Sequence, residues 1–351
     1  MSLHWTESSL ARDWERPEED EAWACLQPVP HALDTLKEQL RALVLAAGFD
    51  VAGFAPPTPP PHAEHFLPWL AAGCQGDMAW MARHPERRLD PNRLMDGLGV
   101  IVVAGVGVRP PEATPGQRGQ DPGLAAIAAH ARRRDYHAVL KQRLKRVVGQ
   151  LEGLLGRPVN ARVLVDTAPV LEKPLAVAAG LGWIGKNTLL IHPRFGAWLL
   201  LAELLLDVPL PPDGPLAEHC GACDLCIRAC PTSALTEQRR LDARRCLAYH
   251  TIESRQPLPP ALARVMGRRV YGCDDCLAVC PFNRFALVAE DPAWPTIPEL
   301  TRIPLTELAR LDEAGFRHLF RGTPVRRVGW QRFRDLVHQA LADDMPPGAR
   351  S

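Results

Sequence analysis

The 351-residue sequence lacks the long apolar run that a membrane span requires. A transmembrane helix needs about 20 consecutive apolar residues, but the most apolar stretch, residues 198–206, is short and contains Glu203. We therefore expect a buried strand or helix there. An apolar signal segment for export is also absent, which favours a reducing, cytoplasmic location.

The sequence also lacks a surplus of charge of either sign, because its net charge is only +1. Net charge alone therefore gives no reason to expect a nucleic-acid partner. The first thirty residues are acidic, whereas basic side chains gather later in short runs. Solvated helix faces explain most such runs, and a phosphate-binding surface requires several of them on one side of the molecule. The basic runs lie at residues 132–134, 143–146, 239–240, 244–245, 268–269 and 326–327.

Nucleotide-binding motifs are missing or out of place. No Walker A pattern occurs, which argues against a P-loop site. Residues 180–185 spell G-L-G-W-I-G and formally match the dinucleotide fingerprint. That fingerprint must follow a strand and open a helix, whereas this pattern follows a predicted helix and precedes a predicted strand. We therefore do not expect NAD or FAD. The adjacent Lys186 and Asn187 could bind an anion or shape the turn.

Cysteine, in contrast, is abundant, and eight of the ten cysteines belong to two clustered runs. The first run has the spacing C-x2-C-x2-C-x3-C-P, and the second has C-x2-C-x3-C-P with one more cysteine upstream. In two-cluster ferredoxins the cysteine before proline ligates the other cluster. The spacing therefore predicts two [4Fe–4S] clusters. The ligands of one would be Cys220, Cys223, Cys226 and Cys280, and those of the other Cys230, Cys246, Cys273 and Cys276.

Other uses of these cysteines are weaker interpretations. Structural zinc also favours paired C-x2-C motifs, but it needs neither a third cysteine at the same spacing nor the C-P ending of both runs. Disulfide bonds are weaker still in a reducing compartment. Cys25 and Cys74 stand alone and are expected to be ordinary thiols. A plain electron-transfer protein and a zinc-stapled nucleic-acid binder stay open at this point.

Apolar periodicity predicts that helices and strands alternate over residues 31–210. We expect helices at residues 34–47, 124–155 and 170–179, and strands at residues 49–54, 100–108, 161–167, 188–191 and 197–206. A helical tail with basic residues is expected from about residue 303.

Asp166 is the acidic residue of most interest, because it ends the apolar strand 161–167. A carboxyl group at that end of a buried strand often faces a pocket, where loss of hydration would raise its pKa. A carboxylic acid that stays protonated can donate a proton to a leaving oxygen. Capping of the next helix explains the residue equally well. His137, on a predicted helix, is expected to be structural.

Together and in this order, the motifs resemble those of the epoxyqueuosine reductases. These are cobalamin-dependent iron–sulfur enzymes of tRNA modification, related to the reductive dehalogenases. The resemblance runs from about residue 48 to residue 341. Besides the two cysteine runs it is carried by V-D-T-A-P-V-L-E-K from Val165, A-G-L-G-W-I-G-K-N-T from Ala179, L-D-A-R-R-C from Leu241, G-D-M-A-W-M-A-R-H-P-E-R-R-L-D-P from Gly76 and R-D-Y-H from Arg134.

The resemblance implies an α+β fold with three parts beyond the N-terminal extension of residues 1–30. These are a mixed-sheet cobalamin and substrate domain (31–215), an appended ferredoxin-like two-cluster module (216–286) and a short helical C-terminal segment (287–351). Departures from the family pattern occur at Ala168, Ala197 and Ala202, and they affect details of the pocket rather than the chemistry. The C-terminal motif also departs from the family pattern, at residues 334–343.

The same resemblance assigns roles to single residues. Asp166 becomes the proton donor, and Arg88 contacts the corrin. The sequence lacks the D-x-H-x-x-G motif, which agrees with cobalamin held base-off without a histidine ligand. Further cofactor contacts fall on Asp166 itself and on Leu190, Leu201, Ala248 and Asp274. Phosphates of the tRNA would be held by Arg245, Arg326 and Arg327.

The activity implied is reduction of the epoxide of epoxyqueuosine to queuosine at the wobble position of tRNA. A low-potential flavodoxin or ferredoxin-like protein would supply electrons to the clusters, and the enzyme would be a monomer. A corrinoid reductase of another substrate, such as an organohalide, is the alternative enzyme.

Overall fold

The computed structural model describes residues 32–111, 122–236, 239–289 and 291–344. The predicted N-terminal extension, with Cys25, lies outside these residues. None of the described helices combines the length and the apolar character that a membrane crossing needs.

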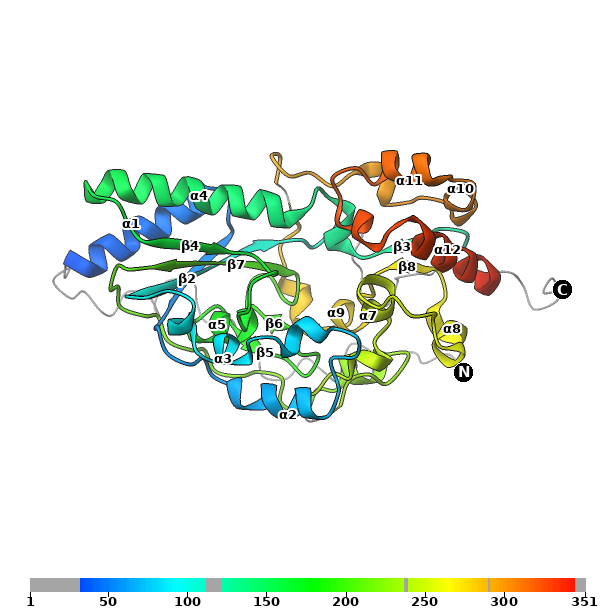
Figure 1. Cartoon of the computed structure of the whole chain (residues 1–351), viewed down its shortest axis with the longest axis horizontal. Helices are drawn as coiled ribbons and strands as arrows, with labels where there is room; N and C mark the ends of the chain where they lie inside the picture. The colour runs from blue at the N-terminus through cyan, green and yellow to red at the C-terminus, as the bar shows by residue number, and fades with distance from the viewer. Residues whose placement is uncertain (1–31, 112–121, 237–238, 290, 345–351) are drawn as a thin grey trace.

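A four-stranded antiparallel sheet is the centre of the larger half of the molecule (Figure 1). Its strands, in spatial order, are β1 (Val51–Ala55), β2 (Val100–Gly107), β7 (Leu199–Leu206) and β4 (Ala161–Leu164). β2 and β7 are the inner strands and are almost wholly buried. Burial on both faces explains why they read as continuous apolar runs. The four strands lie where the sequence predicted strands, and the α+β class is confirmed. The expected mixed sheet is wrong for these four strands, because every pairing between them is antiparallel.

Helices cover both faces of this sheet (Figure 1). α1 (Ala32–Ala46) and α4 (Tyr136–Leu155) pack together on one face, and α5 (Glu172–Ala178) lies on the other. The apolar stripe of α4 was predicted, but the predicted helix start at residue 124 is wrong. Asp135 accepts the N–H of His137 at 3.1 Å and begins the helix there, because an N-cap oxygen satisfies a free backbone donor.

The residues before α4 form part of a second core. β3 (Ala126–Ile127) pairs in parallel with β8 (Arg269–Tyr271), and this is the one parallel pairing among the described strands. The second core takes buried side chains from residues 125–131, 247–271 and 300–340. It therefore joins all three predicted segments, and the boundaries between them stay a prediction.

The C-terminal segment and the cysteine-rich segment consist mainly of short helices. Besides several short 3-10 helices, the other elements of the described residues are α2 (Phe66–Ala71), α3 (Pro85–Leu89), β5 (Trp183–Ile184), β6 (Leu190–Ile191), α6 (Leu225–Ala229), α7 (Leu247–Ile252), α8 (Pro260–Met266), α9 (Asp275–Ala278), α10 (Leu305–Ala309), α11 (Glu313–Leu319) and α12 (Trp330–Asp344). The glycine-rich turn at residues 180–185 runs from α5 into β5. This helix-to-strand context is the opposite of what a dinucleotide fingerprint requires.

Candidate functional site

Asp166 lies just beyond β4 in a backbone conformation that a non-glycine residue rarely adopts. Its φ is 54°, and such left-handed positions cost of the order of 1–3 kcal/mol and cluster at functional sites. The backbone N–H of Asp166 donates to Oε1 of Glu172 at 2.6 Å. The N-cap residue of α5 is Leu171, and no side chain makes a capping hydrogen bond there. Capping of α5 by Asp166 is therefore ruled out, and its carboxylate is directed elsewhere.

The Asp166 carboxylate meets the first turn of α4. Its Oδ2 atom accepts a hydrogen bond from Tyr136 Oη at 3.0 Å and lies 2.9 Å from His137 Nε2. The other ring nitrogen, His137 Nδ1, lies 2.6 Å from Oδ1 of Asp135. Both nitrogens of the imidazole are thus engaged by carboxylates, which holds the ring in one orientation.

The electrostatics of this group differ from the sequence expectation. Burial raises the pKa of Asp166, but the hydrogen bond and charge of His137, with smaller effects of Tyr136 and Arg327, lower it on balance. Burial lowers the pKa of His137, but its bonds to Asp135 and Asp166 raise it to about 9. At neutral pH the proton is therefore on His137. The expected raised pKa of Asp166 is wrong here, because the sequence does not reveal that a cation faces it.

Arg88, the predicted corrin contact, lies near this group and is itself incompletely satisfied. It is buried on α3, with Nη1 3.4 Å from the carbonyl oxygen of Val170 and its guanidinium 5.5 Å from the ring centre of Trp80. Its Nε atom has no hydrogen-bond partner among the described residues. Burial lowers its pKa, opposed by the charges of Glu172 and Asp166. An orphaned buried donor of this kind fits a polar group of a bound ligand.

The other predicted corrin contacts fall into two places. Leu190 and Leu201 belong to the buried apolar cluster on the α5 side of the sheet. Ala248 is half-buried on α7, and Asp274 accepts the N–H of Ala129 at 2.9 Å. The hydroxyl of Thr251, on α7, accepts the N–H of Gly272 at 2.9 Å and so joins α7 to the segment that carries Asp274.

The structure brings the eight clustered cysteines into two groups of four. Burial raises the pKa of Cys280 to about 11, with further contributions from Cys220, Cys226 and Cys223, so these four thiols are neighbours. Burial likewise raises the pKa of Cys276, with contributions from Cys273, Cys246 and Cys230. These groups match those expected from the spacing, and the assignment of each thiol to a cluster stays a prediction. Each offers the four thiols that one [4Fe–4S] cluster requires, and iron binding would remove their protons.

Lys186 and Asn187 connect the larger domain to the cysteine-rich segment through hydrogen bonds. Lys186 Nζ donates to the carbonyl oxygen of Gly221 at 2.8 Å, and Asn187 Nδ2 donates to that of Cys276 at 3.3 Å. Of the two roles considered, shaping the turn fits Asn187, whose Oδ1 also accepts the N–H of Leu189 at 3.2 Å. Cys74 is buried, and Arg240 Nη2 lies 3.2 Å from its sulfur.

The three predicted tRNA-contacting arginines are exposed. Arg327 forms an ion pair with Glu253 at 2.9 Å, and its charge contributes to lowering the pKa of Asp166, so it lies close to the site. Arg326 is its neighbour in sequence. Arg245 belongs to a different segment and donates through Nε to the carbonyl oxygen of Thr232 at 3.0 Å.

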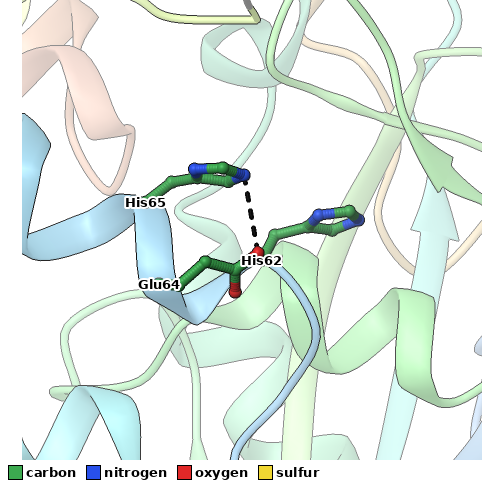
Figure 2. Close-up of side chains that lie close together, drawn as sticks. All are labelled: His62, Glu64 and His65. Carbon is green, nitrogen blue, oxygen red and sulfur yellow. Dashed lines mark ion pairs between the residues drawn. The ribbon is translucent and has the colours of Figure 1, made fainter.

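Two further features were not found from the sequence. A cavity of about 550 Å³ lies beside the start of α12 and is lined by residues that include Arg255, Trp330 and Arg332. Figure 2 shows His62, Glu64 and His65, whose ligand atoms all lie within 4.8 Å of one another. These three side chains are exposed on one short turn, and His65 pairs with Glu64 at 3.5 Å. An ordinary surface ion pair accounts for them.

The fold and site define an iron–sulfur oxidoreductase: two groups of four thiols adjoin an α+β domain that holds a paired carboxylate and imidazole. Two family models match, the 4Fe-4S double cluster binding domain over residues 219–283 and "Epoxyqueuosine reductase QueG, DUF1730" over residues 88–167. Epoxyqueuosine reductase of Vibrio cholerae is 39% identical over 299 residues, which cover 85% of this chain and 81% of the relative. That of Xanthomonas campestris is 40% identical over 296 residues, which cover 84% and 83%. The chain belongs to the epoxyqueuosine reductase family.

Solved structures agree with this assignment. A selenomethionine-labelled epoxyqueuosine reductase aligns with a TM-score of 0.80 at 26% identity, covering 90% of this chain and 84% of the other. An epoxyqueuosine reductase in complex with an epoxyqueuosine-modified tRNA-Tyr stem loop aligns with a TM-score of 0.79 at 27% identity, with the same coverage.

Proposed function

We propose that this protein reduces the epoxide of epoxyqueuosine to the alkene of queuosine at the wobble position of tRNA. The observation that carries the proposal is the Asp166 carboxylate, held in a left-handed turn against a protonated His137. Two relatives support it. One was solved with an epoxyqueuosine-modified stem loop, and the Bacillus subtilis enzyme has an aspartate-bearing catalytic loop that swings out of its active site.

The residues fit a base-off cobalamin. Arg88 would hold a polar corrin substituent through its unsatisfied Nε, and Leu190 and Leu201 would provide an apolar wall. Ala248 and Asp274 would bound the site from the cysteine-rich segment. Neither ring nitrogen of His137 is free to bind cobalt. When bound, cobalamin would supply the two-electron reduction at the epoxide, with electrons from the two [4Fe–4S] clusters.

The chain's own residues would supply protons to the epoxide oxygen. His137 Nε2, which holds a proton at neutral pH, would pass it to Oδ2 of the ionised Asp166, and Asp166 would deliver it to the epoxide oxygen. General acid catalysis of this kind contributes about 10²- to 10⁴-fold to rates. Tyr136 would keep the carboxylate oriented through its 3.0 Å hydrogen bond.

The wobble base must leave the anticodon stack to reach this site, as base-modifying enzymes require. Arg326 and Arg327 would then hold backbone phosphates near the entrance, and Arg245 would bind phosphates farther along the surface. A low-potential flavodoxin or ferredoxin-like donor, a cytoplasmic location and a monomeric state stay predictions.

The test is a reaction of the anaerobically reconstituted protein with cobalamin, a low-potential reductant and tRNA that carries epoxyqueuosine. Queuosine should form, as nucleoside mass spectrometry would detect, and omission of cobalamin should abolish it. Asp166→Asn should lower turnover by about 10²-fold or more with unchanged cluster absorption. Wild-type turnover in this variant would remove Asp166 from its assigned role.

A further inference from the structure

Glu203 is an acidic side chain inside the sheet. It lies in the middle of β7, paired with Val103 of β2 and Leu164 of β4, and it is 0% exposed. Side chains alternate along a strand, so Glu203 shares the face of Leu201 and Leu205, which is the face toward α5. An unpaired buried carboxylate costs several kcal/mol. An apolar residue would suit this position better if the strand were only structural.

The group that Glu203 faces is a second carboxylate. Neither oxygen of Glu203 has a hydrogen-bond donor among the described residues, and its side chain is within hydrogen-bond reach of Glu172. Two ionised carboxylates offer only acceptors, so such a pair is stable in the interior only when it holds a proton. Burial, followed by the charges of Glu172 and Asp166, raises the pKa of Glu203 well above its usual range. The nearby cations, Lys173 and Arg88, have pKa values that burial lowers.

Glu172 connects this pair to Asp166. Its Oε1 accepts the backbone N–H of Asp166 at 2.6 Å, and it is half-buried whereas Glu203 is fully buried. Burial first and the charge of Asp166 second raise the pKa of Glu172 to about 7, against opposing effects of the Asp166 N–H, Lys173 and His137. Glu172 therefore lies between the fully buried acid and the site, and it exchanges a proton near neutral pH.

We propose that Glu203 and Glu172 are a proton store that supplies the second proton of the reduction. This inference rests on the proposed function. Conversion of the epoxide to an alkene breaks two C–O bonds, forms one C=C bond, consumes two electrons and two protons, and releases water. The low-potential donor supplies both electrons through the clusters. Asp166, with His137, supplies one proton. Glu172 supplies the second proton and then receives a proton from Glu203. Glu203 therefore acts only through Glu172 and does not contact the substrate.

Infrared spectroscopy of the cluster-loaded protein without cobalamin tests the store directly. At pH 8 the wild type should show the carbonyl stretch of a protonated carboxylic acid, shifted in D₂O. The band should be absent in Glu203→Gln and present in Glu299→Gln, a matched change of an exposed glutamate. A wild-type spectrum without the band would overturn the proposal, and so would a band that persists in Glu203→Gln.

Kinetics and stability separate a proton store from a structural role. In single turnovers with pre-reduced holoenzyme, Glu203→Gln and Glu172→Gln should slow product formation about 10²-fold, with an unchanged Kd for tRNA. The rate of the wild type should fall as pH rises through about 7, and this fall should be absent in both variants. Glu203→Leu should be equally slow yet unfold at a higher temperature than wild type, because it removes a buried acid.

Wild-type rates in Glu203→Gln would refute the store, and so would slow rates that come with a lower unfolding temperature in both Glu203→Gln and Glu203→Leu. If the wild type failed to convert epoxyqueuosine at all, the proposed function would be wrong. The infrared band would still decide whether the two glutamates hold a proton.

Discussion

The Nε2 atom of His137 lies 2.9 Å from Oδ2 of Asp166, and Nδ1 of the same ring lies 2.6 Å from Asp135. The imidazole therefore links Asp135, the N-cap of α4, to Asp166, which follows β4. Since His137 keeps its proton while Asp166 is ionised, the pair stores a proton next to the position assigned to the substrate oxygen.

Replacement of His137 should impair proton delivery more than binding. His137→Gln keeps a hydrogen-bond donor for Asp166 but cannot restore its proton. We expect kcat to fall about 10²-fold with little change in the KM for tRNA, as steady-state assays would show. A matched change at His318, which is exposed on α11, should have no effect. Equal losses in both variants would count against a specific role.

The His137 ion pair should also make stability depend on pH. Its folded pKa of about 9 exceeds the value of about 6.5 in an unfolded chain. The pair therefore stabilises the fold fully below about pH 6.5, and its contribution is lost as pH rises through about 9. Thermal unfolding followed between pH 6 and 10 should show this decline in the wild type and a weaker one in His137→Gln. Parallel curves would show that the pair contributes nothing to stability.

Single cysteine replacements should distinguish the two clusters. A fully loaded chain should bind about eight irons, and Cys280→Ala and Cys220→Ala should perturb the same electron paramagnetic resonance signal. Cys276→Ala should perturb the other signal, although it is close in sequence to Cys280. Cys74→Ala serves as the control and should keep both. Colourless anaerobic protein that contains zinc would favour the zinc interpretation instead.

Arg327 should contribute to tRNA binding through charge. Arg327→Gln should weaken binding. It should also make the slope of log affinity against log salt shallower by the amount that corresponds to the loss of about one phosphate contact. Arg310→Gln, at an exposed position that ends α10, provides the control. Filter binding at several salt concentrations would measure both. An unchanged slope in Arg327→Gln would leave this arginine as a surface ion-pair partner of Glu253.

The sequence predicted those elements whose signal lies in neighbouring residues, such as apolar runs and cysteine spacing. β2 and β7 were found because strands buried on both faces are continuous apolar runs, and the cysteine groups were found because cluster ligation imposes spacing. The pairing of β3 with β8 joins residues more than a hundred positions apart, so periodicity could not reveal it. The predicted start of α4 was wrong because the short β3 strand and the Asp135 cap interrupt the helical pattern.

The candidate site was predicted only in outline. Asp166 was identified from its place at the end of a strand, but its pKa was judged from burial alone. The direction reverses because His137, 29 positions earlier in the sequence, supplies a hydrogen bond and a charge. Glu203 was read only as an interruption of an apolar run. A fully buried acid inside an apolar run itself indicates a functional role, because it does not stabilise the sheet.

The second core has a consequence for the start of α4. The N–H of Asp135 donates to the carbonyl oxygen of Gly322 at 2.8 Å, and Phe316 and Phe320 are buried in the core that also holds residues 125–131. The C-terminal segment thus fixes the position of the imidazole that faces Asp166, although it provides no cluster ligand. A chain cut after residue 286 would retain every cysteine of both groups. It would nevertheless lose the contacts that align its imidazole with its acid.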